Sequence, residues 1–201
     1  MSERYDNRFL DILGDFNFEV LENSKYSIYA LSKNLKFIYF NPAWFDFADK
    51  NGFDKVASKN MILGTPFLKS IKGVRLRLYF YNNYKKVLKT GKAWHHDYEC
   101  SSKTEFRFFH QTAYPLKNQE GILVIHTEMF KLPMDNMNRE AFKAIEQRYL
   151  NADGQIIQCS NCRHTQRADK PEHWDWVPDW VEKLPFNHKL DICPTCEHLY
   201  L

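Results

Sequence analysis

Four of the five cysteines in this 201-residue chain form two C-x-x-C pairs. Cys159 pairs with Cys162 and Cys193 with Cys196, and 30 residues separate the pairs. Thiolates are preferred ligands of zinc in closed tetrahedral sites, and each pair can place two sulfurs beside one ion. The spacing therefore predicts a structural Zn²⁺ site with these four cysteines as its ligands. Four protein ligands leave no position for water, so zinc hydrolysis is not expected.

Two other kinds of site use the same residue types. A rubredoxin-like iron site also has two C-x-x-C pairs, the second of them Cys-Pro-x-Cys, and would make the protein a redox carrier. Rubredoxin pairs typically continue with glycine, whereas this chain has Arg163 and Glu197 there. Redox-active dithiols need a thiolate of low pKa at a helix N-terminus, and the sequence gives no such context. His164 and His198 follow the two pairs and are expected beside the site rather than as ligands.

A second group of polar residues lies in strand-like, aromatic-rich sequence: His95, Arg107 and His110. Neighbouring side chains of a strand point to opposite faces, so His95 and His96 face apart, as do Arg107 and His110. Each of the three candidates could orient a small-molecule ligand inside a domain. A core filled by aromatic side chains, without a ligand, is the alternative. The sequence has no phosphate loop, G-x-S-x-G, H-E-x-x-H or kinase motif, so no enzyme is expected.

The elements that position these residues follow from the hydrophobic pattern. Apolar and β-branched runs predict strands, and capping residues with helix-length stretches predict helices. The expected strands are residues 26–31, 37–40, 93–100, 105–114 and 122–130, and the expected helices are 43–50 and 74–90. This order predicts an α+β fold: a five-stranded antiparallel sheet with helices on one face.

The character of the sequence changes near residue 131. The expected organisation is an N-terminal helical cap (1–22), the sheet domain (23–131), a connector helix (132–152) and a four-cysteine module (153–201). The connector is expected because one apolar stripe runs along it, made by Met137, Phe142, Ile145 and Tyr149. Such a stripe could pack on its own domain or form a dimer seam, and the sequence does not decide between them.

Several segments of the sheet domain resemble the PAS family. They are the hairpin Tyr26–Phe40, the helix start Asn41-Pro42-Ala43-Trp44-Phe45, Gly64-Thr65-Pro66-Phe67, and the strands Glu105–Phe109 and Gly121–His126. The tail is similar to a segment found behind PAS and receiver domains of bacterial signalling proteins, with its C-x-x-C-R start, a central tryptophan and an I-C-P-x-C end. The resemblance implies a PAS-like sensor domain followed by a zinc-ribbon-like module in a bacterial signal-transduction protein. The ligand of such a domain usually lies between sheet and helices.

Charge and hydropathy limit the partners. The net charge is +3, but residues 151–201 carry five basic and eight acidic side chains. A zinc–tetrathiolate centre would add about −2 by formal charge, which disfavours a nucleic-acid-binding regulator. Trp174, Trp176 and Trp180 are therefore expected in a core or packing surface rather than stacked on bases. No apolar stretch is long enough for a membrane helix, and the first residues are charged and polar without the apolar segment of a signal peptide behind them. We therefore expect a cytoplasmic protein with a signalling partner or a second copy.

Overall fold

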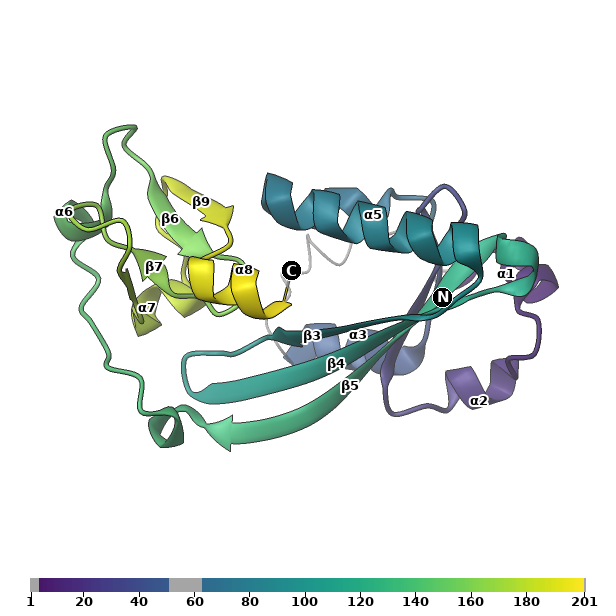
Figure 1. The fold of residues 1–201 in the computed structure, drawn as a ribbon. Coiled ribbons are helices and arrows are strands. Elements are labelled where there is room, and N and C mark those ends of the chain that lie inside the picture. Colours follow the sequence, from purple (N-terminus) through teal and green to yellow (C-terminus); the bar gives the residue numbers. More distant parts are fainter. Residues whose placement is uncertain (1–3, 51–62, 201) are drawn as a thin grey trace. The chain divides into compact units, whose positions relative to one another are not determined.

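The computed structural model describes residues 4–50 and 63–200, and it confirms the α+β fold with a five-stranded antiparallel sheet (Figure 1). The strand order is β2-β1-β5-β4-β3. The elements of this part of the chain are α1 (Asn7–Ile12), α2 (Phe18–Glu22), β1 (Ser27–Ser32), β2 (Phe37–Phe40), α3 (Pro42–Lys50), η1 (Phe67–Lys69), α5 (Val74–Thr90), β3 (Trp94–Glu99), β4 (Glu105–Pro115), η2 (Lys117–Gln119) and β5 (Gly121–Pro133). The expected hairpin, the two helices and the three-stranded meander are all present.

The chain divides into two compact units. The first contains Met1–Ile71, Phe80–His96 and His110–Thr127, and the second contains Lys72–Tyr79, Asp97–Phe109 and Glu128–Leu201. The turn end of the β3–β4 hairpin therefore belongs to the same unit as the cysteines. No helix among the described residues is long and apolar enough to cross a membrane.

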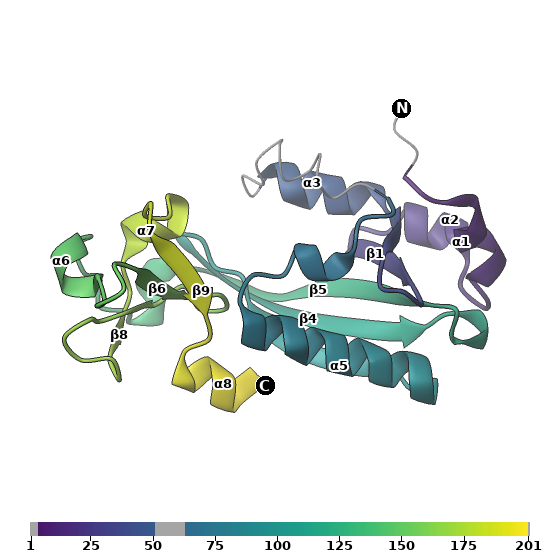
Figure 2. The same ribbon diagram turned by 90° about the horizontal axis from the view of Figure 1, so that it is seen from above.

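Two apolar layers cover the sheet in the first unit. The N-terminal helices pack on one side, where the ring of Phe9 stacks on that of Tyr39 with centroids 4.4 Å apart. Tyr29 of β1 points to the other side, where its ring contacts Phe67, and Phe67 in turn contacts Tyr84 of α5. Helix α5 runs along this side of the strands (Figure 2). The alternation of side chains in β1 thus supplies both layers.

Asn41 explains how the hairpin passes into α3. Its side chain is fully buried, and its Oδ1 accepts hydrogen bonds from the backbone N–H groups of Ile28 (2.9 Å) and Trp44 (3.0 Å). Its Nδ2 donates to the backbone carbonyl oxygens of Leu21 and Tyr26. The Asn41-Pro42 step is therefore a helix N-cap, as expected, and it also fixes the end of α2 to β1.

The prediction of a connector helix over residues 132–152 is wrong. The chain there forms the short turn η3 (Met134–Met137), an extended stretch and one helical turn, α6 (Glu146–Tyr149). Phe142 donates its backbone N–H to the carbonyl of Trp176 at 2.9 Å, and half-buried Phe142 and Ala144 pack against the Tyr149 cluster while Ile145 is half exposed. The backbone pairing with residue 176, and the alternation by which Phe142 and Ala144 face the core, make this stretch extended instead of helical.

The C-terminal residues form a small four-stranded sheet in the order β8-β7-β6-β9. Its elements are β6 (Ile156–Cys159), β7 (Thr165–Gln166), β8 (Trp174–Asp175), α7 (Pro178–Glu182), β9 (His188–Asp191) and α8 (Pro194–Tyr200). We call residues 156–200 the cysteine module. Trp176 and Trp180 are buried in this part of the chain, as expected for core tryptophans.

Candidate metal centre

Parallel pairing of β6 with β9 brings the two C-x-x-C pairs together. Cys159 ends β6 and lies in register with Asp191, which ends β9. Because parallel strands end at the same edge of a sheet, the turn after β6 and the turn after β9 are neighbours. The first turn carries Cys162, and the second carries Cys193 and Cys196 at the start of α8.

The four sulfurs fit a tetrahedral ion. An ion bound to sulfur at ~2.3 Å holds its ligand atoms about 3.8 Å apart. The Sγ atoms of Cys162 and Cys193 lie 3.7 Å apart, and all four Sγ atoms lie within 4.8 Å of one another. All four cysteines are buried. The predicted ligands are thus brought together, and the cluster is compatible with metal binding.

N–H groups surround the sulfurs. The backbone N–H of Cys193 donates to the Sγ of Cys159, and that of Cys196 donates to the Sγ of Cys193, both at 3.4 Å. The side-chain amide of Asn161 donates to the Sγ of Cys196 at 3.2 Å. The neighbouring thiols, Cys162 first, stabilise the Cys159 thiolate and lower its pKa well below the usual range. Such donors stabilise thiolates, the form that binds metal.

Arg139 supplies a positive charge beside the cluster. Burial by itself lowers the pKa of Arg139, but the hydrogen-bonded carboxylate of Glu99 and the thiolates of Cys162 and Cys196 outweigh it and raise this pKa. The guanidinium also lies over the ring of Trp176, 5.1 Å from its centroid. Arg139 is therefore held charged close to the sulfurs, and no feature of the sequence pointed to it.

The two histidines behind the pairs differ in position. His164 lies with its Nδ1 3.2 Å from the Sγ of Cys162, so it is a hydrogen-bonding neighbour of the cluster. Burial lowers the pKa of His164. His198 is exposed on α8. Within residues 4–50 and 63–200, the His, Cys, Asp and Glu residues grouped closely enough to hold an ion are the four cysteines.

The structure separates the three predicted ligand-orienting residues. His95 and His110 come together, with His95 Nδ1 3.2 Å from both His110 Nε2 and Thr112 Oγ1. Their neighbour His96 is buried and stacks on Trp94. Arg107 is buried elsewhere, and its Nε donates to the carbonyl of Cys100 at 2.8 Å. Ligand binding by His95, Arg107 and His110 stays a prediction.

A polar cluster that the sequence analysis missed lies under α5. The hydroxyl of Tyr84, fully buried, is 2.9 Å from that of Tyr29 and accepts a hydrogen bond from Gln111 Nε2 at 3.1 Å. The ring of His126 packs 5.4 Å from that of Tyr29. Burial, and then the nearby His96, lower the pKa of His126 to about 3. Alternation along β4 and β5 could have identified Gln111 and His126, because each is polar at a position facing α5.

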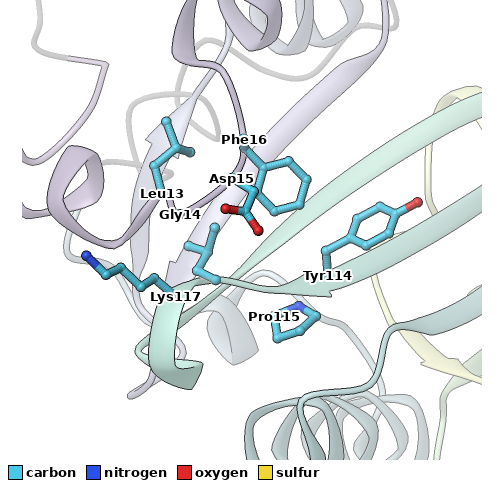
Figure 3. A pocket seen from close by; sticks show the side chains of 8 residues that line it. Leu13, Gly14, Asp15, Phe16, Tyr114, Pro115 and Lys117 are labelled. Carbon is cyan, nitrogen blue, oxygen red and sulfur yellow. The ribbon is translucent and has the colours of Figure 1, made fainter.

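A surface hollow lies at the other end of β4 (Figure 3). It is lined by Leu13, Gly14, Asp15, Phe16, Tyr114, Pro115, Leu116 and Lys117. Neither the residues of the polar cluster nor the predicted ligand-orienting residues line this hollow. The polar cluster and the hollow are therefore separate features of the sheet domain.

Comparison with known proteins gives structural matches only. No protein-family model matches the chain, and no curated protein matches it. A PAS domain of BvgS from Bordetella pertussis is similar in structure, with a TM-score of 0.41, 16% identity, and 56% of this chain and 82% of that chain covered. The phage VqmA–DPO complex matches with a TM-score of 0.42, 12% identity and coverage of 55% and 50%. The PAS domain of the Cronobacter turicensis quorum-sensing receptor RpfR, in complex with C12:0, matches with a TM-score of 0.38, 13% identity and coverage of 55% and 100%. Likeness at this level carries no information about the ligands or partners of this chain.

Proposed function

We propose that this protein is a signal-transduction sensor whose sheet domain binds a small molecule between α5 and the sheet. The observation that carries the proposal is the buried hydroxyl of Tyr84, hydrogen-bonded with Tyr29 and Gln111 inside an aromatic core. Even when they are paired, buried polar groups add little stability over apolar side chains of the same shape, so a cluster of them at the centre of a small domain needs a reason. Recognition of a polar ligand supplies that reason, since a few convergent polar groups in an apolar site fix the orientation of a ligand.

The chemistry of the cluster favours an uncharged ligand. Burial raises the pKa of Tyr84, and burial lowers that of His126 to about 3, so both side chains are neutral near pH 7. Tyrosine hydroxyls, an amide and a neutral imidazole offer donors and acceptors without a net charge. The proposed ligand therefore has hydroxyl or carbonyl groups on an apolar body, and it exchanges its hydrogen bonds for those among Tyr29, Tyr84 and Gln111.

The four-cysteine cluster is proposed to hold one structural zinc ion. Cys159, Cys162, Cys193 and Cys196 would bind it as thiolates, and the ion would supply folding free energy to the cysteine module rather than catalysis. We further propose that the protein is not an enzyme, that it acts in the bacterial cytoplasm, and that it signals through a protein partner or a second copy. If metal analysis finds iron instead of zinc, the alternative of a rubredoxin-like iron centre replaces this proposal.

Native mass spectrometry of the protein purified without added metal tests both parts. One zinc per chain and a retained organic mass are the expected result. The variants Tyr84→Phe and Gln111→Leu should lose that mass, whereas Tyr81→Phe, which changes an exposed tyrosine of the same helix, should retain it. If the wild type carries no organic mass, the melting temperatures of wild type and Tyr84→Phe are compared with and without added neutral metabolites. A shift equal in Tyr84→Phe and wild type would contradict the proposed site.

A further inference from the structure

One side chain connects the cysteine cluster to the β3–β4 hairpin. Asn161 lies between the cysteines of the first pair and is 7% exposed. Its Nδ2 donates to the Sγ of Cys196 at 3.2 Å, and its Oδ1 accepts the backbone N–H of Glu99 at 2.9 Å. A single amide therefore bridges a metal ligand of the second pair and the last residue of β3. These residues belong to the same compact unit.

A buried ion pair makes a second connection at the same place. The two guanidinium nitrogens Nη1 and Nη2 of Arg139 each donate to the carboxylate of Glu99 at 2.8 Å. Ser101 donates its hydroxyl to the same carboxylate at 2.5 Å. The side chain of Glu99 is 6% exposed and that of Arg139 is 15% exposed, so solvent screens this pair weakly.

Charge balance links the ion pair to the cluster. Arg139 is joined to the cluster through Glu99, whose backbone N–H binds Asn161. Its guanidinium also lies over Trp176, whose ring packs 5.6 Å from that of His164, the neighbour of Cys162. A divalent ion with four thiolates carries about −2 by formal charge, and Glu99 adds a further negative charge. Arg139 is thus shared between the metal centre and the hairpin. Removing Arg139 would leave a buried carboxylate beside an anionic centre, which is strongly unfavourable.

We propose that Asn161 and Arg139 are positioning residues of the metal centre, and that through them metal binding holds the turn end of the hairpin, Asp97–Phe109, in its folded position. The inference rests on the proposed metal site. Coupling between two sites is reciprocal, so a change that displaces the hairpin end also lowers metal affinity. Metal binding would then stabilise the turn end of the β3–β4 hairpin, which lies in the same compact unit, as well as the cysteine module itself.

Zinc affinity, measured by competition with a chromophoric chelator, tests the positioning role. Loss of an outer contact typically lowers metal affinity about 10–100-fold, and we expect that range for Asn161→Ala and Arg139→Gln. Arg139→Lys keeps the charge and should recover most of the loss. Thr195→Ala is the matched control, because Thr195 holds the corresponding position in the second pair and is exposed. Its affinity should stay within about twofold of the wild type.

Amide hydrogen exchange of the wild-type chain tests this stabilisation of the hairpin end without any variant. The Glu99 amide should exchange at least about 10-fold faster after zinc is removed by chelation, because its acceptor Asn161 is released. The Ala30 amide of β1, in the other compact unit, is the reference and should change little. In zinc-loaded Asn161→Ala the Glu99 amide should also exchange faster than in zinc-loaded wild type.

The outcomes separate this inference from the metal site itself. A wild type that binds no zinc contradicts the proposed site and the stabilisation of the hairpin end together. One zinc per chain, with equal affinities in Asn161→Ala, Arg139→Gln and Thr195→Ala, overturns the positioning role alone. A Glu99 amide whose exchange is unchanged on chelation overturns the stabilisation of the hairpin end while the zinc site stands. If a variant fails to fold, the exchange experiment on the wild type still tests whether metal binding stabilises the hairpin end.

Discussion

His126 gives the sheet domain a pH dependence that can be worked out from its surroundings. Burial, and then the nearby His96, lower its pKa from 6.5 to about 3. Between these values the unfolded chain binds a proton that the folded protein excludes, so stability is fully present above the unfolded pKa and falls as the pH falls. From pH 7 to pH 5 the loss caused by His126 is about 2 kcal/mol, since a tenfold difference in proton affinity between the two states corresponds to about 1.4 kcal/mol.

Urea unfolding of the wild type and of His126→Asn at both pH values measures this loss. Other groups, including the cysteine thiols, titrate in both proteins, so the difference between the two changes isolates His126. We expect the wild type to lose about 2 kcal/mol more than the variant. His95→Asn, an exposed histidine, should behave as the wild type. Equal losses in wild type and His126→Asn would refute the reasoning that the fold keeps this imidazole neutral.

Two further predictions concern the contacts that stabilise the sheet. Asn41→Ala removes a helix cap and leaves the buried N–H of Ile28 without its acceptor, so unfolding measurements should show a loss of about 2–4 kcal/mol. Asn17→Ala, which removes an exposed cap of α2, should cost about 1 kcal/mol or less, and equal costs would contradict the role of burial. Gly121→Ala would place its Cβ 2.6 Å from the carbonyl oxygen of Leu31. The midpoint of urea unfolding should therefore fall by the equivalent of about 1–3 kcal/mol. An unchanged midpoint would show that the backbone of β1 and β5 shifts to accommodate the added methyl group.

The fold of the sheet domain was predictable because its signals are local. A hairpin with alternating apolar residues, an Asn-Pro helix start and a helix ended by a glycine of positive φ, Gly91, each depend on a few neighbouring residues. The cysteine ligands were predictable for a similar reason, since each pair is a local motif. The parallel pairing of β6 with β9, which brings the pairs together, has no local signal.

The connector and the polar cluster show where local patterns fail. Phe142 and Tyr149 have helical spacing, but a backbone partner at Trp176 and the core of the cysteine module decide their conformation. Alternation along β4 could have placed Gln111 on the face toward α5, but its role depends on Tyr84, which comes from another element of the fold. Asn161 and Arg139 were missed because their roles depend on Glu99, far from both in the sequence.

The parallel ladder also determines how the cysteine module assembles. Strand β9 reaches β6 only after the chain has closed a loop of about 30 residues, at an entropic cost of about 3 kcal/mol by the usual logarithmic scaling. The ladder itself is short, from Ile156 to Cys159, and an ion bound by both pairs offsets this cost by an amount that grows with the free concentration of the ion. With the proposed ion in the cluster, the pairing of β9 with β6 would depend on the free metal concentration, and we expect metal scarcity to release β9 while the local turns of each pair persist.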